Sequence, residues 1–531
     1  MQVYSNSYEK AINEIAYELK KQWPIDKNHF EEIKKKIASK YKLTRVPSNT
    51  EVLLALEEEF KEKVAQELAI KKTRSASGVV VVAAMTAPLP CPHKEGPCIY
   101  CPGGPKFGTP QSYTGYEPAA MRAIQYNFDP KKQVEARLKQ LEQMGHSTKK
   151  VELIIMGGTF PSFSVKYQTF FIKGCFDAIN GLSSSSIEEA ISMAEKAKRR
   201  NVALTIETRP DYCKEEHVDL MLSYGTTRVE IGVQSIYEDV LKFVNRGHTV
   251  KESIDAIRIA KDAGLKVAIH IMPGLPLSSF NRDIEMFKVI FEDQVFKPDM
   301  IKVYPTLVVE GTKLYDLYKK GEYKALTDEE AIEIVAKALE LSPNWIRFMR
   351  VQRDIPATKI VAGPKHGNLR ELAIRRLVQS GRNTKEIRFR EAGLRNFFEA
   401  TEIKLVRTDY EASLGHEVFL EYVDAKTNTL FGYLRLRIPS EFAHRPEIKS
   451  SKAAIVRELK VVGRATPFGK VYSKSWQHRG LGASLLKEAE RIALEDFDAH
   501  KVLVISAIGT REYYYKLGYE KEGVYVSRKI K

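Results

Sequence analysis

The chain has 531 residues, of which 43% are hydrophobic and 29% are charged, and its formal net charge is +16. This length exceeds what one hydrophobic core supports and predicts about two to four domains. The longest apolar run, near residues 79–85, is far shorter than a bilayer span, and the first thirty residues contain no hydrophobic block, so neither a membrane span nor a signal peptide is expected. The positive charge favours a polyanion partner, with nucleic acid as the first expectation and a lysine-rich solvated surface as the alternative.

Residues 1–74 are predicted to form a basic helical region. Ser48 and Glu51 have the spacing of a capping box at a helix start, and apolar residues then recur at helical spacing from Leu53 to Leu68. We expect the region to bind a phosphate backbone, although an ordinary helical lid has the same pattern. The cations just ahead of the first predicted strand, and so the first RNA-binding candidates, are Lys71, Lys72 and Arg74.

Residues 75–309 alternate predicted strands and helices. The strands are short and almost continuously apolar, as in a parallel sheet covered by helices. Six such β/α units predict an α/β fold with a partial (β/α)6 barrel, and barrels of this kind carry their chemistry at the C-terminal ends of the strands. The expected strands are 79–85, 151–156, 202–207, 228–233, 266–272 and 300–304.

The loop after the first strand holds three of the five cysteines, Cys91, Cys98 and Cys101. Three thiolates are one fewer than a closed tetrahedral zinc site needs, whereas a [4Fe–4S] cluster on three thiolates keeps one iron open. The usual spacing for clusters that bind S-adenosylmethionine is C-x3-C-x2-C, and the spacing here is C-x6-C-x2-C. A structural zinc loop, with His93 as the fourth ligand, is the alternative.

Glycine or polar residues stand at the end of every predicted strand. Gly157 and Gly158 follow the second strand and let bare backbone approach a ligand, Glu207 ends the third strand, and Gln234 follows the fourth. Because the strand ends share one rim with the cysteine loop, they predict a single site. Their combination favours the open cluster over zinc.

The other two cysteines, Cys175 and Cys213, fall in predicted helical segments and are expected to be buried structural residues. Five cysteines with three of them clustered do not suggest a disulfide framework. The cysteine pattern therefore predicts a reducing compartment, the cytoplasm.

Residues 310–395 are predicted to form a helical, basic connector. Arginine at this density suits contact with phosphate better than solvation alone, so the connector is expected to bind RNA, in particular through Arg375 and Arg376. The basic residues here include Lys365, Arg370, Arg375, Arg376, Arg382, Lys385, Arg388, Arg390 and Arg395.

Residues 396–531 change to a meander of strands around an N-acetyltransferase signature. Gln477, Gly480 and Gly482 have the form Q-x-x-G-x-G ahead of an amphipathic helix. Such glycines let backbone N–H groups at a helix N-terminus face the pyrophosphate of acetyl-CoA. A predicted strand at 501–507 and the sequence REYYYKLGY at 511–519 then follow as in that fold, so the segment is predicted to be a GNAT-type mixed α/β domain.

The combined pattern resembles one family, the catalytic subunit of Elongator in its single-chain archaeal or bacterial form. This family of tRNA uridine-34 carboxymethyluridine synthases joins a radical S-adenosylmethionine barrel to an acetyltransferase domain. The resemblance runs from about residue 40 onward. It rests on RSASG at 74–78, the cysteine loop, QSYTGYE at 111–117, MGGTF at 156–160, ETRPD at 207–211, YPT at 304–306, RVQRDIP at 350–356 and HGNLRE at 366–371.

The resemblance implies site residues. The three loop cysteines would ligate a [4Fe–4S] cluster, and Gly157, Gly158, Glu207 and Gln234 would surround S-adenosylmethionine. The first cysteine gap is shorter than in the eukaryotic members, and the chain lacks the cysteines for a thiolate-rich zinc site found elsewhere in the family. The implied contacts with acetyl-CoA are Lys150, Glu458, Leu459, Lys460, Val461, Gln477, Gly480, Leu481, Gly482, Ala483 and Tyr514, and the implied catalytic residues are Lys150, Tyr513 and Tyr514.

The resemblance also implies a reaction and a partner. Uridine 34, in the anticodon loop of tRNA, would become 5-carboxymethyluridine, with acetyl-CoA as the co-substrate and a 5′-deoxyadenosyl radical as the reagent. The chain would act as a monomer or homodimer, without other Elongator subunits and without a membrane. The alternatives are a protein lysine acetyltransferase with a structural iron–sulfur barrel and a tRNA-binding scaffold.

Overall fold

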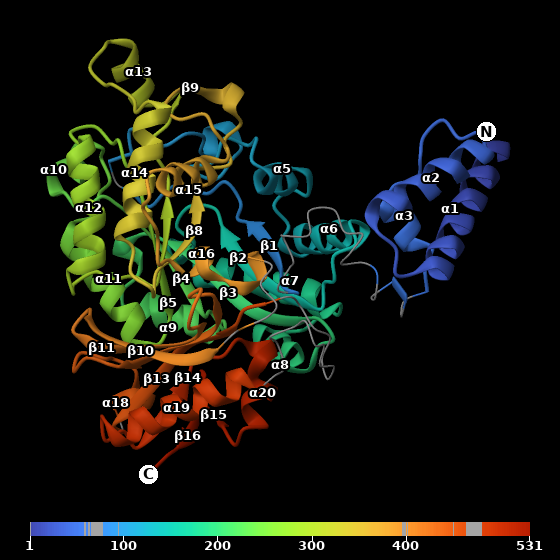
Figure 1. The fold of residues 1–531 in the computed structure, drawn as a ribbon. Helices are drawn as coiled ribbons and strands as arrows, with labels where there is room; N and C mark the ends of the chain where they lie inside the picture. Colours follow the sequence, from blue (N-terminus) through green and yellow to red (C-terminus); the bar gives the residue numbers. More distant parts are fainter. Residues whose placement is uncertain are drawn as a thin grey trace.

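The computed structural model describes residues 2–57, 60–61, 64, 78–93, 95–395, 400, 402–449, 451–463 and 480–531. Within these ranges no helix is both long and apolar enough to cross a membrane. Three units follow one another along the chain: an N-terminal helical bundle, a curled parallel sheet with its helices, and a second sheet of mixed direction (Figure 1).

The N-terminal bundle stands beside the main body and has a small hydrophobic core of its own (Figure 1). The predicted capping box is confirmed, because Ser48 Oγ accepts from the N–H of Glu51 at 3.3 Å and the Glu51 carboxylate accepts from the N–H of Ser48 at 2.8 Å. The candidates Lys71, Lys72 and Arg74 lie outside the described residues. The helices are α1 (Gln2–Gln22), α2 (Lys27–Lys40) and α3 (Asn49–Leu54).

The central unit is an open barrel of seven parallel strands in the order β1-β2-β3-β4-β5-β6-β8. The six predicted strands are confirmed, and their apolar side chains form one large buried cluster with the outer helices. The strands are β1 (Val80–Met85), β2 (Lys150–Met156), β3 (Arg200–Thr208), β4 (Arg228–Gln234), β5 (Lys266–Ile271), β6 (Met300–Val303) and β8 (Arg347–Val351). The helices up to β6 are α5 (Pro118–Gln125), α6 (Pro130–Gln143), α7 (Val165–Asn180), α8 (Ile187–Lys196), α9 (Glu215–Ser223), α10 (Glu238–Phe243), α11 (Val250–Asp262) and α12 (Phe280–Glu292).

Strand β8 comes from the segment 310–395, which was expected to be a helical connector. It runs parallel to β6, with Met300 opposite Arg347, and so adds a seventh unit to the six expected. Residues after β6 also form the small sheet of β7 (Val308–Val309) and β9 (Ile360–Ala362). The helices of this segment are α13 (Lys313–Lys319), α14 (Asp328–Leu341), α15 (Leu369–Gln379), α16 (Ile387–Arg390) and α17 (Ala392–Arg395).

The C-terminal unit is a seven-stranded sheet in the order β10-β11-β12-β13-β14-β16-β15. Neighbouring strands are antiparallel except β13 and β14, which run parallel. The strands are β10 (Ile403–Ala412), β11 (Gly415–Asp424), β12 (Leu430–Ile438), β13 (Ala453–Val461), β14 (Lys501–Val504), β15 (Glu520–Glu522) and β16 (Tyr525–Lys529). The helices are α18 (Pro446–Lys449), α19 (Leu481–Glu495) and α20 (Arg511–Tyr515).

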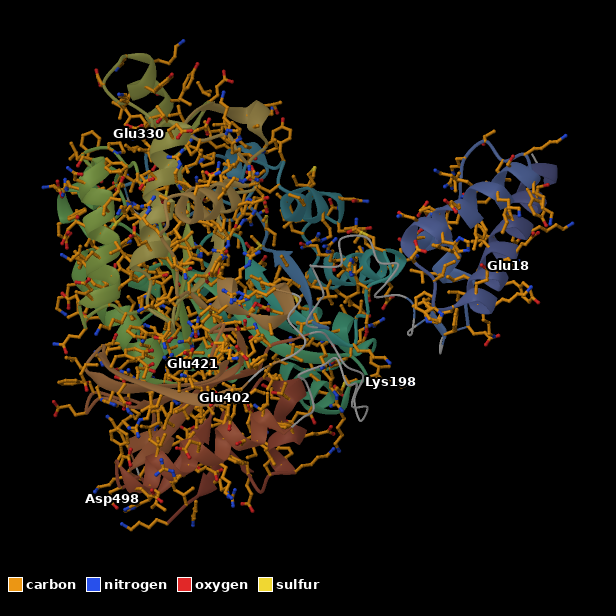
Figure 2. All side chains as sticks on the ribbon, viewed as in Figure 1. Glu18, Lys198, Glu330, Glu402, Glu421 and Asp498 are labelled. Atoms are coloured by element: carbon orange, nitrogen blue, oxygen red, sulfur yellow. The ribbon has the colours of Figure 1, made fainter. Side chains whose placement is uncertain are left out.

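The C-terminal sheet packs against the N-terminal ends of the barrel strands (Figure 1). Arg457 of β13 donates to the carbonyl of Leu265, just before β5, at 2.9 Å, and its two Nη atoms lie 2.6 Å from the carboxylate of Asp299, just before β6. Glu421 of β11, labelled in Figure 2, accepts from buried Arg390 at 2.8 Å. One hydrophobic cluster continues across this boundary, so the two sheets form a single packed body.

Candidate active site

A cavity of about 170 Å³ lies at the C-terminal ends of the barrel strands. It is lined by the cysteine loop after β1 and by the residues that end β2, β3 and β4. The structure therefore brings together the residues that the sequence placed on one rim. The predicted site residues in the lining are Cys91, Cys98, Cys101, Gly157, Gly158, Glu207 and Gln234.

Each cysteine sulfur of this loop faces an N–H donor from a different segment of the chain. Donors and positive charge beside sulfur stabilise the thiolate that binds metal and orient it. The pairs are Arg209 Nη1 with Cys91 Sγ at 4.0 Å, Arg246 Nη1 with Cys98 Sγ at 3.8 Å, and Gln111 Nε2 with Cys101 Sγ at 3.4 Å.

The spacing of the three sulfurs disfavours zinc. Zn–S bonds of about 2.3 Å in a tetrahedron would place the sulfurs about 3.8 Å apart. The three sulfurs do not all lie within 4.8 Å of one another, and no two of them form such a group with His93. An iron–sulfur cluster binds its cysteines through different irons and keeps them farther apart, so the pocket fits a [4Fe–4S] group on three thiolates.

Two residues of the pocket lining have backbone conformations that favour glycine. Gly157 has a φ of +123°, and a Cβ there would overlap with Thr86 Oγ1. Gln234 has a φ of +71°, and its buried Oε1 finds no hydrogen-bond partner among the described residues. A strained residue with an unsatisfied buried oxygen at a cavity is a mark of a ligand site.

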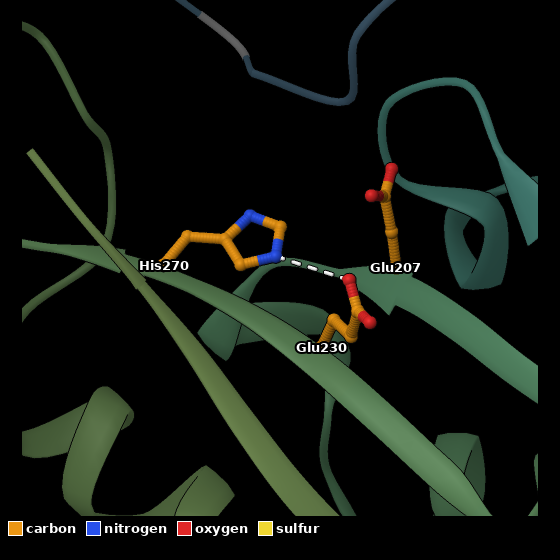
Figure 3. Close-up of side chains that lie close together, drawn as sticks. All are labelled: Glu207, Glu230 and His270. Carbon is orange, nitrogen blue, oxygen red and sulfur yellow. Dashed lines mark hydrogen bonds and ion pairs between the residues drawn. The ribbon is translucent and has the colours of Figure 1, made fainter. Parts of the chain in front are cut away.

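Three ionisable side chains of the cavity lining, Glu207, His270 and Lys302, lie close to the fully buried Glu230. The ligand atoms of Glu207, Glu230 and His270 lie within 4.8 Å of one another, and Figure 3 shows the His270 ring facing the Glu230 carboxylate, at 3.2 Å. Lys302 pairs with Glu230 and lies 3.6 Å from Glu207, so an ammonium group already supplies the positive charge that a metal cation would bring. Burial, followed by the charge of Lys302, lowers the pKa of His270, and its ring is therefore neutral at pH 7.

Sequence reasoning placed Lys302 among the polar residues at the strand ends, and Lys302 does line the cavity, but it missed Glu230 and His270. They occupy strands that otherwise read as continuously apolar, so no local motif marks them. The available signal was a period of two: Arg228 with Glu230 on β4, and Lys266 with His270 on β5, occupy alternate positions that share one face of the sheet.

A second candidate site lies where β13 and β14 separate. These strands pair only from Ala453 to Val456, so the backbone groups of the following β13 residues are open on the side of β14. Helix α19 begins next to this cleft, because a Cβ on Gly482 would lie 3.7 Å from Val461. Open strand groups beside a positive helix N-terminus suit a pantetheine arm and its pyrophosphate. The predicted contacts here are Glu458, Leu459, Lys460, Val461, Gly480, Leu481, Gly482 and Ala483, while Gln477 lies outside the described residues.

The two tyrosines that were predicted to be catalytic have ring centroids 5.2 Å apart but differ in exposure. Tyr513 is 41% exposed, and a Cβ on Gly482 would lie 3.0 Å from its hydroxyl oxygen, so Tyr513 borders the cleft. Tyr514 is only 7% exposed and packs in the core of the sheet, where burial raises the pKa of its hydroxyl.

Lys150, the first residue of β2, lies at the end of the barrel that faces the C-terminal unit. It is paired in register with Arg200, whose Nη2 lies 2.7 Å from Glu512, next to Tyr513. Burial lowers the pKa of Lys150. The predicted acetyl-CoA residues of the barrel and of the C-terminal unit therefore converge on one side of the molecule, at the opposite end of the strands from the cysteines.

Most arginines of the segment 310–395 are engaged in ion pairs. Arg376 lies 2.5 Å from Glu329, and Arg390 is buried against Glu421. Arg375 differs, because 61% of its side chain is exposed and its ion-pair contact, with Glu371, is as long as 3.8 Å. Internal pairing therefore accounts for much of the arginine density that suggested RNA binding, and Arg375 is the more accessible of the two predicted RNA-binding residues.

Comparisons with known proteins identify the family of the chain. Residues 91–287 match the radical SAM superfamily, residues 298–379 match the radical SAM C-terminal domain, and residues 8–76 match the ELP3 N-terminal domain. The fold class expected from the sequence is confirmed: an open parallel barrel of radical SAM type is followed by a further domain built on a mixed sheet.

Full-length relatives share much of the sequence. The tRNA uridine(34) acetyltransferase of Methanocaldococcus jannaschii is 50% identical over 530 residues, which cover 97% of each chain. Elongator complex protein 3 of Saccharomyces cerevisiae is 45% identical over 506 residues, which cover 93% of this chain and 91% of that protein. The solved structure of the archaeal Methanocaldococcus infernus Elp3 with an N-terminal deletion (1–46) has a TM-score of 0.76 and 47% identity, and the match covers 85% of this chain and 99% of that one.

Proposed function

The chain belongs to the family of the tRNA uridine(34) acetyltransferases and Elongator complex protein 3, and we propose that it modifies wobble uridine 34 of tRNA. The product is 5-carboxymethyluridine, with acetyl-CoA as the source of the two added carbons. The purified single chain is expected to act without other subunits, as a monomer or homodimer.

One structural observation supports this function above the alternatives: the two candidate sites lie at opposite ends of one barrel. The cysteine pocket opens at the C-terminal ends of the strands. The β13 cleft faces their N-terminal ends, where Arg457, the neighbour of Glu458, contacts the carbonyl of Leu265. A protein lysine acetyltransferase would need only the cleft, whereas a reaction that joins an acetyl carbon to a nucleobase needs both sites.

The proposed cofactor-binding residues fall into two groups, one at each end of the barrel strands. Cys91, Cys98 and Cys101 would hold the cluster, and the rim with Gly157 and Gln234 would hold S-adenosylmethionine. When bound, these groups supply radical chemistry, which an unactivated C–H bond requires and which no side chain offers. The chain itself orients the sulfurs through their N–H donors and keeps the pocket polar at its base. The cleft at β13 and α19 would hold acetyl-CoA.

The segment between the cysteine loop and α5 contributes Gln111, Ser112 and Tyr113 to the pocket lining, and this rim carries exposed side chains suited to single-stranded RNA. Phe107 and Tyr116 are 70% and 50% exposed, and Lys359 Nζ lies 4.3 Å from the Tyr116 ring centroid. Exposed aromatic rings stack on unpaired bases, and cations beside them contact the phosphates. Uridine 34 lies in a single-stranded loop, so its base can turn into a pocket at modest cost.

The proposal is tested by nucleoside mass spectrometry of tRNA after anaerobic incubation. The reaction contains the reconstituted protein, S-adenosylmethionine, a reductant and acetyl-CoA. We expect a 5-carboxymethyluridine peak with the native chain and none with Cys98→Ala. Cys213→Ala is the matched control, because Cys213 is buried and lies outside the pocket lining, and it should retain the peak.

Two results would contradict the proposal. One is the absence of a new nucleoside although the cluster is present and tRNA is bound. The other is transfer of acetyl groups to protein lysines that continues in the Cys98→Ala variant, which would support the acetyltransferase alternative.

A further inference from the structure

The inside of the barrel is charged along its length, whereas the lumen of a closed β/α barrel is usually filled by branched apolar side chains. Arg228 of β4 forms an ion pair with Glu152 of β2, near the N-terminal ends of the strands. It also lies 3.3 Å from Glu230, two residues later on β4. Glu230 pairs with Lys302, which reaches Glu207 in the cysteine pocket. A chain of ion pairs therefore connects the two ends of the barrel.

Three side chains with hydrogen-bond donors occupy neighbouring positions of three adjacent strands, near the N-terminal ends of the strands. Thr205 of β3 is in register with Arg228 of β4, and Arg228 is in register with Lys266 of β5. Side chains at directly paired positions of a parallel sheet share one face, so the hydroxyl, the guanidinium and the ammonium group belong to one row.

Several donor atoms of this row lack a hydrogen-bond or ion-pair partner among the described residues. Thr205 Oγ1 and Arg228 Nε are buried and have no hydrogen-bond partner among the described residues. Lys266 has no carboxylate of the described chain within ion-pair distance, and burial lowers its pKa to about 8. Thr205 is fully buried and Arg228 is nearly so. Unsatisfied buried donors at adjacent positions indicate a missing acceptor rather than a packing accident.

The row faces the strand that borders the acetyl-CoA cleft. Arg457 of β13 touches the carbonyl of Leu265, the neighbour of Lys266, at 2.9 Å. The carboxylate of Glu458, the next residue of β13, acts electrostatically on both Arg228 and Lys266. A thioester lying along β13 would therefore end beside these donors.

We propose that Thr205, Arg228 and Lys266 bind the acyl group of acetyl-CoA, with their donors on its carbonyl oxygen. The C-terminal unit then holds the CoA moiety, and the barrel holds the reacting end and directs the methyl carbon into the lumen. This subsite rests on the proposed function, because it requires acetyl-CoA in the β13 cleft. It identifies positioning groups for the acyl end that belong to the barrel.

The test compares two CoA analogues that cannot be hydrolysed. One is a methyl ketone in which CH₂ replaces the thioester sulfur, and it keeps the carbonyl. The other is S-ethyl-CoA, which lacks the carbonyl. Calorimetry measures the binding of both to the complete protein. We expect the native chain to bind the ketone about tenfold or more tightly than S-ethyl-CoA, as for a charge-assisted hydrogen bond.

Lys266→Met should bring this ratio to about twofold or less while the affinity for S-ethyl-CoA is unchanged, since only the carbonyl contact is lost. Thr205→Val, which is nearly isosteric, should lower the ratio by about threefold and tests the proposed row of donors at a second position. The unchanged affinity for S-ethyl-CoA shows that a loss in Lys266→Met is not a folding defect. Lys173→Met, on the outer helix α7, is the matched control and should leave the ratio unchanged.

The outcomes separate the subsite from the proposed function. If the native chain binds both analogues with equal affinity, or if Lys266→Met keeps the full preference for the ketone, the acyl subsite is wrong while the acetyl-CoA cleft stands. If the native chain binds neither analogue, acetyl-CoA is not the co-substrate, and both proposals fail.

Discussion

Arg246 ties the cysteine loop to strand β4, because its Nη1 lies 3.8 Å from Cys98 Sγ while its Nη2 donates a 2.7 Å hydrogen bond to the carbonyl of Gly232. The arginine is buried, and a Cβ on Gly232 would come within 2.7 Å of it. The cluster ligand and the wall of the pocket are thus held by the same side chain. Such donors to sulfur also influence the reduction potential of a bound cluster.

Replacing Arg246 by leucine is expected to lower the reduction potential of the reconstituted cluster. A positive donor stabilises the more negative, reduced state, and its removal should shift the potential by about 60 mV, equivalent to about 1.4 kcal/mol for one electron. Potentiometric titration followed by EPR measures the shift. Arg246→Lys should retain part of the effect because the charge remains. An unchanged potential in Arg246→Leu, at native iron content, would show that this contact does not tune the cluster.

Removing the carboxylate of Asp299 is expected to destabilise the whole protein. Asp299 and Arg457 are both fully buried, and Asp299→Asn would leave a buried guanidinium without its main partner, at a cost of about 3–5 kcal/mol. Asp239→Asn, at the exposed pair with Arg282, is the control and should cost about 1 kcal/mol or less. Denaturant unfolding measures both. Equal effects of the two variants would mean that the buried network does not hold the two sheets together.

The sequence predicted the strands and the two cofactor motifs because these features are local. Apolar runs marked β1 to β6, and the spacing of cysteines and glycines marked the binding loops. Strand β8 was not predicted, because Arg347 and Arg350 interrupt its apolar pattern. The partner that neutralises Arg347 is Glu391, which lies 44 positions away in the sequence. The ion pairs inside the barrel were not predicted either, because their members are also distant in the sequence. Glu230 has meaning only beside Lys302 and His270, which lie on other strands, and sequence spacing does not show which strands are neighbours.

Stability of the N-terminal bundle is expected to fall in acid through Glu51. Its hydrogen bonds with Arg45, followed by those with Ser48 and Tyr8, lower its pKa from 4.5 to about 2. A carboxyl whose pKa is depressed by folding stabilises the folded state above its unfolded pKa, and this contribution is lost as the pH falls from about 4.5 towards 2. Glu51→Gln should cost about 1 kcal/mol at pH 7 and nothing at pH 2.

Trp23, which packs in this bundle against Phe60, reports its unfolding in urea by fluorescence, provided that Trp345 and Trp476 are replaced by phenylalanine. A cost for Glu51→Gln that is equal at both pH values would assign the effect to packing rather than to the capping carboxylate.

The rim of the cysteine pocket is expected to bind the anticodon loop by stacking and by charge, and the two contributions can be separated. Phe107→Ala should weaken binding of an anticodon stem-loop by about 1–3 kcal/mol without changing the salt dependence. Lys359→Gln should instead lower the slope of log K against log salt by about 0.7, as for one phosphate contact on a single strand. Fluorescence anisotropy at several salt concentrations measures both quantities.

Phe170, another exposed phenylalanine, provides the control, because it belongs to helix α7 and not to the segment between the cysteine loop and α5. Phe170→Ala should leave affinity and slope unchanged. If it weakens binding as much as Phe107→Ala does, the RNA does not enter by this rim.

Gly482, the glycine of α19, is expected not to tolerate a side chain without loss of CoA binding. A Cβ there would lie 3.0 Å from the Tyr513 hydroxyl and 3.7 Å from Val461, so it would narrow the gap that the pantetheine arm must pass. Gly482→Ala should raise the Kd for CoA about tenfold, a loss of about 1.4 kcal/mol, while leaving the binding of S-adenosylmethionine at the other end of the barrel unchanged. The double variant with Tyr513→Ala should recover part of the CoA affinity, because the neighbouring ring that the new methyl group would displace is gone. Calorimetry with each ligand decides, and a loss of both affinities together would point to general unfolding instead of a blocked cleft.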